Sequence, residues 1–287
     1  MDGIISNDID DQSLLLIGWK QRYTQLETGS FEARTFSLDV TGSTSILRKH
    51  TNLRMHKRFV TPGNLIRLAA VLPGSDMSIF QGKKIIEGDI FILKPNIELE
   101  LICHGNFDVA VIELDSNLSF LYKEKNYYEI PDILPKKFTG DFSDQIYSAF
   151  LNKQMDIDSL YFMCAPIIRA LHYKDLIHYK NGVKDTVAQA IHFVEHCLDN
   201  LVDMPKISEI STHLGISGRM LEYAFAYKYG ISPIQFFKFM RLHGARRDIR
   251  IGKLNVTDVA MKWGFSHLGC FSGHYRDTFG ESPSHTR

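Results

Sequence analysis

Apolar residues near the C-terminus follow the same helical spacing in two blocks about fifty residues apart. The first block contains Ile210, Leu214, Leu221, Phe225 and Tyr229, and the second contains Val259, Trp263, Phe271, Tyr275 and Phe279. A spacing of four residues places side chains on one face of an α-helix. In both blocks a glycine and then a serine interrupt the spacing. Each block therefore predicts a helix, a tight turn and a second helix.

The residues between the paired helices suit such a turn. Gly215 and Gly264 can adopt a positive φ without steric cost, which a chain needs to leave one helix and enter another within a few residues. Ser217 and Ser266 are expected to be the N-caps of the second helices. A single helix-turn-helix pattern is a weak indication of DNA binding. Two copies that both end in Gly-x-Ser-Pro are a much stronger one.

The pattern in the N-terminal half is different. Short apolar stretches alternate with turn signals such as Pro73-Gly74 and Gly105-Asn106 from about residue 29 to residue 115. Strands are expected at 68–72, 77–80, 90–93, 97–102 and 109–114. Many short strands at this spacing predict an antiparallel sandwich or barrel. From about 141 to 179 the spacing becomes helical, and 180–182 (Lys-Asn-Gly) resembles a hinge. The fold class is expected to be α+β.

These motifs resemble a known family. Residues 183–287 resemble the DNA-binding domain of the AraC/XylS family of bacterial transcription regulators. The resemblance rests on 257–260 (Thr-Asp-Val-Ala), 264–266 (Gly-Phe-Ser), 271–272 (Phe-Ser), Tyr275 and 279–283 (Phe-Gly-Glu-Ser-Pro), and on an Arg-Leu-x-x-Ala-Arg stretch at 241–246. The last stretch matches the linker helix that joins the two helix-turn-helix units in this family. The strings 267–269 and 280–284 also resemble a subgroup that includes an ethanolamine-utilisation regulator.

The resemblance implies two domains. Residues 1–180 would form a cupin-like β-barrel or sandwich with following helices, for effector sensing and dimerisation. Residues 183–287 would form an all-α domain with two helix-turn-helix units. We expect a sequence-specific DNA-binding regulator, an activator, which binds double-stranded promoter DNA, contacts RNA polymerase and is a candidate homodimer. A small molecule or a protein partner would control it.

The exposed faces of the second helices are the expected DNA-binding residues, because the major groove admits a helix and displays a distinct pattern for each base pair. The first unit offers Ser217, Arg219, Met220, Glu222 and Tyr223. The second offers Ser266, His267, Gly269, Cys270, Gly273 and His274, with Arg276 nearby for phosphate. This second helix departs from many family members, which have an arginine at the position of Gly273.

Composition narrows the function classes. The chain has 287 residues, 44% of them hydrophobic, and no apolar run long enough for a membrane helix, so we expect a cytoplasmic protein with no membrane partner. Net charge is zero, but residues 183–287 hold 13 Lys/Arg against 10 Asp/Glu. This small excess means that phosphate contact depends on where the charges lie. Arg241, Arg246, Arg247, Arg250 and Lys253 form the densest basic run, either a phosphate contact or a solvated helix face.

Catalytic and metal chemistry is not indicated. The four cysteines are scattered, no His-x-His pair suits a metal-binding cupin, and no nucleophile elbow or phosphate loop is present. We expect no metal, no cofactor and no enzyme activity; an enzyme fused to a DNA-binding module is the remaining alternative. For an effector, Arg54, His56 and Arg58 alternate along an expected strand and would suit an anion if they face the barrel interior, with Phe80 and Phe91 as candidate walls. Otherwise they are solvated surface and plain core.

Overall fold

A computed structural model describes residues 3–16, 18–41, 44–63, 66–113, 131–171, 186–199 and 204–286. The chain forms two compact units. The first comprises Met1–Tyr23 and Phe31–Tyr179, and the second comprises Lys180–Arg287 together with Thr24–Ser30. The expected hinge at 180–182 lies outside the described residues.

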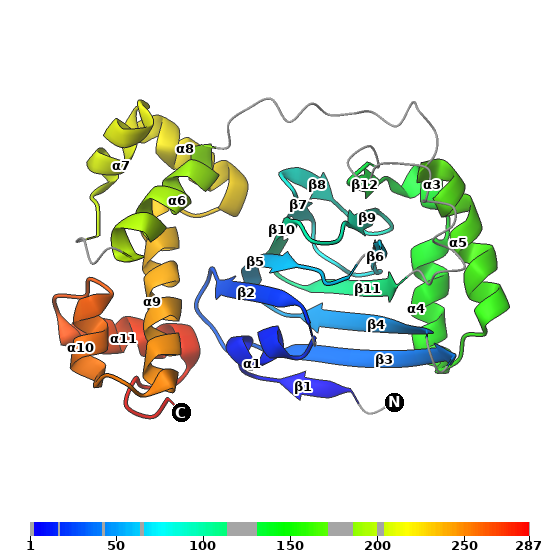
Figure 1. Cartoon of the computed structure of the whole chain (residues 1–287), viewed down its shortest axis with the longest axis horizontal. Coiled ribbons are helices and arrows are strands. Elements are labelled where there is room, and N and C mark those ends of the chain that lie inside the picture. Colours follow the sequence, from blue (N-terminus) through cyan, green and yellow to red (C-terminus); the bar gives the residue numbers. More distant parts are fainter. Residues whose placement is uncertain are drawn as a thin grey trace. The chain divides into compact units, whose positions relative to one another are not determined.

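The first unit contains two antiparallel sheets (Figure 1). The seven-stranded sheet has the order β1-β3-β4-β11-β6-β9-β12, and the five-stranded sheet has the order β2-β5-β10-β7-β8. The strands are β1 Ile4–Ser6, β2 Lys20–Gln25, β3 Ala33–Thr41, β4 Thr44–Thr51, β5 Arg54–Val60, β6 Arg67–Val71, β7 Ser78–Phe80, β8 Lys83–Ile85, β9 Ile90–Leu93, β10 Glu98–His104, β11 Phe107–Glu113 and β12 Ile133–Leu134. The strands expected from 68 to 114 are confirmed to within two residues. The sheet region begins earlier than expected, at Ile4, and includes the short helix α1, Ile9–Leu14.

Two apolar layers hold this unit together. Side chains from both sheets form the inner core, which includes Met55, Phe80, Phe91 and Phe107. The outer face of the seven-stranded sheet forms a second core with helices α4, Phe142–Asn152, and α5, Ile157–Leu171. A short helix α3, Lys136–Thr139, precedes them. The expected helical stripes over 141–179 are confirmed as far as Leu171, where the described part of this region ends. In the strands of the seven-stranded sheet, successive residues therefore point in turn to the inner core and to the core beneath α4 and α5.

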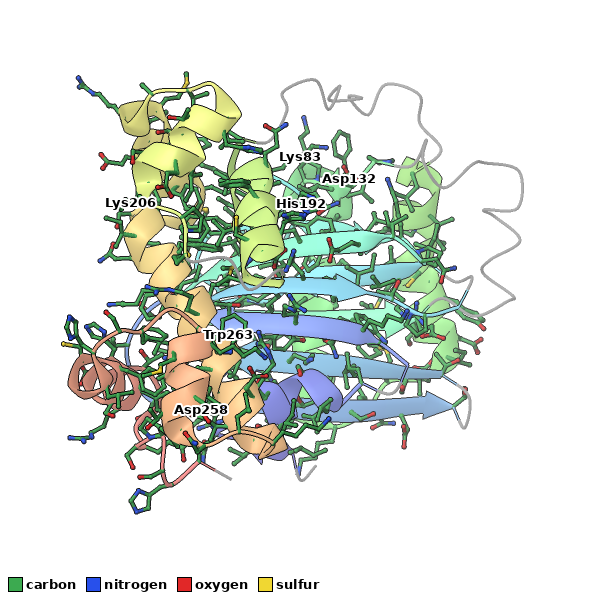
Figure 2. All side chains as sticks on the ribbon, turned by 60° about the vertical axis from the view of Figure 1, so that its left-hand side comes forward. Lys83, Asp132, His192, Lys206, Asp258 and Trp263 are labelled. Atoms are coloured by element: carbon green, nitrogen blue, oxygen red, sulfur yellow. The ribbon has the colours of Figure 1, made fainter. Side chains whose placement is uncertain are left out.

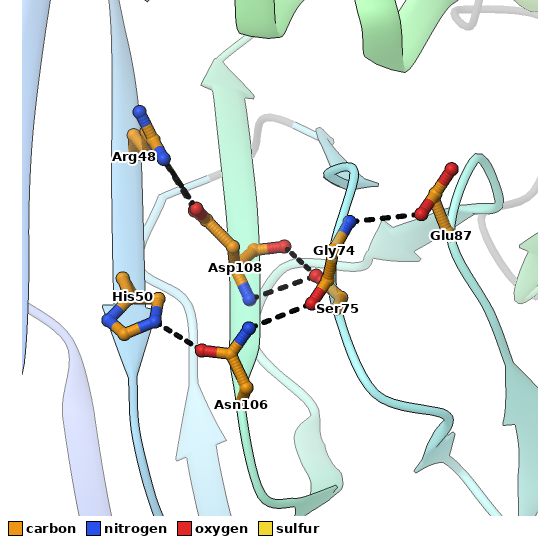
Figure 3. Close-up of polar contacts among 7 residues, drawn as sticks. All are labelled: Arg48, His50, Gly74, Ser75, Glu87, Asn106 and Asp108. Carbon is orange, nitrogen blue, oxygen red and sulfur yellow. Dashed lines mark hydrogen bonds and ion pairs between the residues drawn. The ribbon is translucent and has the colours of Figure 1, made fainter.

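Polar contacts fix the loop before β7 against β11 (Figure 3). The Ser75 hydroxyl donates to the Asp108 carbonyl and accepts from the Asp108 amide, both at 3.0 Å. Asn106 Nδ2 donates to the Gly74 carbonyl at 2.8 Å, and the side-chain oxygen Oδ1 of Asn106 contacts His50 Nε2. The Gly74 amide donates to Glu87 Oε2 at 2.9 Å. The Asp108 amide and the amide and carbonyl of Gly74 each gain a side-chain partner in this way.

The second unit is helical (Figure 1). Its helices are α6 Thr186–Asp199, α7 Ile207–Leu214, α8 Gly218–Tyr229, α9 Pro233–Ile251, α10 Val256–Lys262 and α11 Leu268–Phe279. Helix α9 begins at a capping box in which Ser232 Oγ accepts from the Gln235 amide, with Pro233 in the first turn. Figure 1 shows α9 running from the group α6–α8 to the pair α10–α11. Among the described helices of the whole chain, none is long and apolar enough to cross a membrane.

Candidate nucleic-acid interface

Helices α7 and α8 form the first predicted helix-turn-helix. Gly215 ends α7 with φ 66°, so the turn uses the left-handed backbone conformation that glycine tolerates. Ser217 is the N-cap of α8, and its hydroxyl accepts from the Met220 amide at 3.2 Å. Both expectations for this turn are confirmed. The cap fixes where α8 begins and therefore which of its residues face outward.

Aromatic packing determines the buried face of α8. Phe225 and Tyr229 are fully buried and contact rings of α9, with the Tyr229 and Phe236 ring centroids 4.5 Å apart. Phe225 lies 5.3 Å from Phe236 and 5.4 Å from Phe237, measured between centroids. Leu221 completes this face. The opposite face of α8 is left to solvent.

The five residues expected to contact DNA in this unit are all exposed: Ser217, Arg219, Met220, Glu222 and Tyr223. Sequence reasoning missed a sixth member of this surface. Tyr227 is 68% exposed and stacks on Tyr223, which is 72% exposed, with ring centroids 6.3 Å apart. Its position four residues after Tyr223 is the spacing that could have identified it.

Helices α10 and α11 form the second helix-turn-helix. Gly264 has φ 72° and Phe265, Phe271 and Tyr275 are buried, as the repeated pattern predicts. The start of α11 differs from the expectation. His267 is the N-cap residue and makes no side-chain cap hydrogen bond, so the prediction that Ser266 caps this helix is wrong. The N-cap follows the turn glycine by two residues in the first unit, from Gly215 to Ser217, and by three in the second, from Gly264 to His267, so the serine lies outside the cap position.

Of the residues expected to contact DNA in this unit, Ser266, His267, Gly269, Cys270, His274 and Arg276 are exposed and Gly273 is half-buried. The two glycines leave part of the α11 surface without side chains. A Cβ placed at Gly269 or Gly273 meets no heavy atom within 4 Å. Among the described residues, no neighbouring atom therefore requires glycine at these positions.

Two members of the basic run make contacts within the second unit. The Arg241 guanidinium donates to the Gly264 carbonyl at 3.0 Å and lies 4.6 Å from the Phe265 ring centroid. Arg246 pairs with Glu281 at 3.0 Å and is 7% exposed. Both attach α9 to the second helix-turn-helix, a role that neither sequence interpretation of the run included. Lys253 is exposed, and Arg247 and Arg250 are half-buried.

Trp263 makes a second attachment between α10 and α9 (Figure 2). Its indole Nε1 donates to Asp248 Oδ2 at 2.8 Å, and Lys262 pairs with the same carboxylate at 2.7 Å. Its ring lies against Gly244 of α9, where a Cβ would come within 2.2 Å of ring atom Cη2. This glycine is thus required by the close approach of the ring.

The candidate effector residues lie on different faces of β5 and its neighbours. Met55 and Phe59 belong to the inner core, so Arg54, His56 and Arg58 alternate to the other face of the strand. His56 is buried and contacts Glu100 Oε1 through Nε2 at 2.8 Å. Phe80 and Phe91 are in the inner core, with ring centroids 4.6 Å apart. The structure therefore does not bring Arg54, His56 and Arg58 together with these two rings. In the described residues, no three His, Cys, Asp or Glu side chains come together as a metal site.

The sequence of the second unit is similar to known regulators. The family model of a helix-turn-helix domain matches residues 210–287. A probable thc operon regulatory protein of Rhodococcus erythropolis is 36% identical over 81 residues, which is 27% of this chain and 24% of that protein. XylDLEGF operon transcriptional activator 2 of Pseudomonas putida is 30% identical over 101 residues, which is 34% of this chain and 62% of that protein. The chain therefore spans less than two thirds of either relative.

A solved structure of a probable AraC family transcriptional regulator from Rhodopseudomonas palustris is 36% identical. The match covers 36% of this chain and 94% of that one, with a TM-score of 0.32. These relatives are regulators by name, and the matched region is the one that carries both helix-turn-helix units and the linker helix. The chain belongs to the AraC/XylS family of transcription regulators.

Proposed function

We propose that the chain is a sequence-specific DNA-binding regulator that activates transcription and inserts α8 and α11 into successive major-groove faces of one promoter site. The observation that carries this proposal is the pair of exposed helix faces, on α8 and α11, joined by the single helix α9. Helix α9 has 19 residues, which corresponds to a length of about 28 Å at 1.5 Å per residue. Successive major-groove faces on one side of DNA are about 34 Å apart. The linker thus supports a separation close to one turn of the duplex.

In the first unit, α8 would read bases directly. Arg219 can donate two hydrogen bonds to guanine, and Glu222 can accept from cytosine. Both side chains are exposed, on the face opposite the aromatic core. The stacked Tyr223 and Tyr227 add an apolar surface that suits the methyl group of thymine. This combination supports a base-specific role for the first unit.

In the second unit, α11 would depend more on its backbone. No arginine occupies the stretch from Gly269 to Gly273, and no described atom lies near either glycine in the place of a side chain. A surface without side chains lets a helix lie deeper against the sugar-phosphate backbone. Arg276, which is exposed, would supply the phosphate contact. We infer that this unit positions the protein while the first unit specifies the sequence.

The proposal is tested with the full chain and duplexes from the neighbourhood of its own gene. A fluorescence titration should find at least one duplex that binds more tightly than a scrambled duplex of equal length and composition. The preference should persist as salt is raised, although both affinities fall. Equal affinity for all duplexes, including those that extend into neighbouring promoters, would contradict the proposal.

Arg219→Ala is expected to weaken binding to the preferred duplex by about 1–3 kcal/mol and to relax the requirement for one base pair. Arg276→Ala is the matched variant, because it removes the same side chain from the other unit. It should weaken preferred and scrambled duplexes by a similar factor and reduce the salt dependence. The measurement is a titration of each variant against single-base variants of the preferred duplex. If Arg219→Ala weakens preferred and scrambled DNA equally, Arg219 contacts phosphate and does not read a base.

The proposal also covers how the DNA-binding activity is regulated. An activator must recruit or contact RNA polymerase, and a homodimer would add a second pair of reading helices. We propose that a small molecule bound in the first unit regulates the protein. Control by a protein partner is the alternative, and an enzyme fused to the module is disfavoured by the regulator family of the matched region. The subgroup that includes an ethanolamine-utilisation regulator stays a prediction.

A further inference from the structure

Two lysines are buried between the sheets of the first unit. Lys49 of β4 is 7% exposed and Lys57 of β5 is 6% exposed. The side chains come from different sheets and approach the same phenol ring, with the Nζ atoms 5.7 Å and 5.5 Å from the Tyr23 centroid. Lys57 Nζ also lies 5.8 Å from the Phe107 centroid. Lysine is rarely buried to this extent unless an anion accompanies it.

The neighbouring protein groups do not provide that anion. Lys49 Nζ donates to the Tyr23 hydroxyl at 3.3 Å, and Lys57 Nζ donates to the Thr51 hydroxyl at 3.4 Å. Lys57 also hydrogen-bonds the Cys103 thiol. In the part of the chain that the structure describes, no carboxylate pairs with either lysine. Apart from the aromatic faces of Tyr23 and Phe107, both ammonium groups therefore have only neutral oxygen or sulfur partners among the described residues.

The two acidic groups beside the lysines stay protonated. Burial raises the pKa of the Tyr23 phenol far above its ordinary value. Burial also raises the pKa of the Cys103 thiol, and the nearby lysines only partly oppose this effect. Neither side chain is negatively charged near neutral pH. Burial and the charge of Lys57 lower the pKa of Lys49 to about 7, as expected where positive charge is confined without a counter-ion.

Further buried polar groups surround this pair. Thr35 of β3 is the cross-strand neighbour of Lys49 and accepts a hydrogen bond from Gln12 Nε2 at 3.1 Å. Gln12 is fully buried on α1, and its oxygen Oε1 accepts no hydrogen bond from a described residue. Around these polar groups lie apolar side chains of the inner core, including Met55, Phe59 and Leu101. A polar, positively charged end beside an apolar wall suits an organic anion.

We propose that the first unit binds an organic carboxylate whose two oxygens accept hydrogen bonds from Lys49 and Lys57 and whose apolar body contacts the inner core. As the effector site of a regulator, this rests on the proposed function. A buried cation that gains a charged partner changes from an unfavourable to a favourable group. The ligand would therefore stabilise the folded first unit, and each lysine would be needed for binding more than for folding.

The binding test uses the full chain with sodium acetate, sodium hexanoate and the neutral analogue hexanamide at constant ionic strength. Acetate and hexanoate should raise the unfolding temperature with saturation, hexanoate at lower concentration, whereas hexanamide should not. Lys49→Met and Lys57→Met should each weaken hexanoate binding by more than about tenfold, measured by calorimetry. The exposed lysine of β8 provides the control Lys84→Met, which should bind hexanoate as the parent chain does.

Without ligand, both lysine variants should unfold at the same temperature as the parent or higher, because methionine removes a buried charge at similar volume. If a variant remains folded but is no longer stabilised by hexanoate, the substitution has removed the binding site and not the fold. No saturable stabilisation by either carboxylate, an equal response to hexanamide, or a response that survives in both variants would each overturn the proposal. The DNA titration tests the proposed function independently of the carboxylate measurement. A chain that prefers its duplex but ignores carboxylates overturns only this inference, and a chain that binds hexanoate but no DNA overturns only the proposed function.

The lowered pKa of Lys49 also predicts that the stability of the ligand-free protein depends on pH. Its pKa is about 7 when folded and ordinarily 10.5, so above pH 7 the unfolded chain binds more protons at this group than the folded chain. Its contribution to the free energy of unfolding therefore rises with pH from about 7 to 8.5. The groups that face it are Lys57, Tyr23 and Cys103, and this window lies below the ordinary value of 9.0 at which Cys103 would begin to oppose the rise. Urea unfolding should show a steeper rise in the parent chain than in Lys49→Met; identical slopes would show that Lys49 has an unshifted pKa.

Discussion

Replacing Gly244 by alanine is expected to lower the free energy of unfolding of the second unit by more than about 2 kcal/mol. The new Cβ would come within 2.2–2.4 Å of three atoms of the Trp263 ring, so the ring must move. Movement would also break or lengthen the hydrogen bond from Trp263 to Asp248. The gain of roughly 1 kcal/mol that alanine brings to a helix interior does not compensate. Urea unfolding followed by circular dichroism at 222 nm, a helix signal, measures the change.

Two variants separate the steric explanation from the general effect of removing glycine. Gly273→Ala makes the same change in the interior of α11, where the new Cβ meets no neighbour, and it should raise the free energy of unfolding by roughly 1 kcal/mol. Trp263→Phe shortens the ring that meets Gly244. In the Gly244→Ala and Trp263→Phe double variant, the combined loss should be smaller than the sum of the single losses. Additive losses would show that the ring does not cause the cost at Gly244. DNA affinity should fall with Gly244→Ala as well, because the displaced α10 supports α11.

The second unit could be predicted from sequence almost residue by residue because its signals are local. Gly215, Gly264 and Ser217 lie at positions where the backbone itself demands their properties. Ser266 shows the limit of this reasoning. Two blocks with the same spacing differ by one residue at the start of the second helix, and the capping position moves to His267. Similarity of pattern therefore predicts the element but not its boundary.

The first unit was predictable as a set of strands but not as a binding site. Periodicity separates the two faces of β5, yet it does not say which face turns inward, because that depends on the strand's partners in the sheet. Met55 and Phe59 are buried in the inner core, and Lys57 lies on the same face of β5, so its side chain also points inward. Arg54, His56 and Arg58, which the sequence offered as the anion-binding face, consequently lie on the other side. A buried lysine has no sequence signature, since lysine is ordinarily a surface residue.

The DNA-binding residues and the proposed effector-binding residues therefore differ in how far the sequence alone can identify them. DNA-reading residues are exposed and lie at fixed helical spacing, so a repeat of about fifty residues indicates them directly. The proposed effector residues come from β2, β4, β5 and β10, and only the pairing of two sheets brings them together. Arg48 lies one residue before Lys49 on β4, so its side chain points to the opposite face of the seven-stranded sheet. On that face it pairs with Asp108 of β11.

Asp108→Ala is expected to lower the free energy of unfolding of the first unit by about 2–4 kcal/mol. Asp108 Oδ1 accepts from Arg48 Nε at 3.0 Å, and Asp108 Oδ2 accepts from Nη2 at 2.6 Å and from Nε at 3.1 Å (Figure 3). The side chains are 17% and 7% exposed for Arg48 and Asp108, so solvent screens the pair only slightly. Arg48 also lies 4.8 Å from the Tyr147 ring of α4. Without Asp108, the buried guanidinium would lose its anion while it remains held beneath the helix.

Graded substitutions distinguish the charge from the shape of this pair. Asp108→Asn keeps one acceptor for Arg48, so it should cost less than Asp108→Ala. The double variant Arg48→Met and Asp108→Leu removes both charges and fills the layer beneath α4 with apolar side chains. It should recover most of the stability, because a well-packed apolar pair can replace a buried ion pair at little cost. Chemical unfolding of the four chains gives these differences. If the double variant is as unstable as Asp108→Ala, the loss comes from the packing of β4 against β11 and not from an unpaired charge.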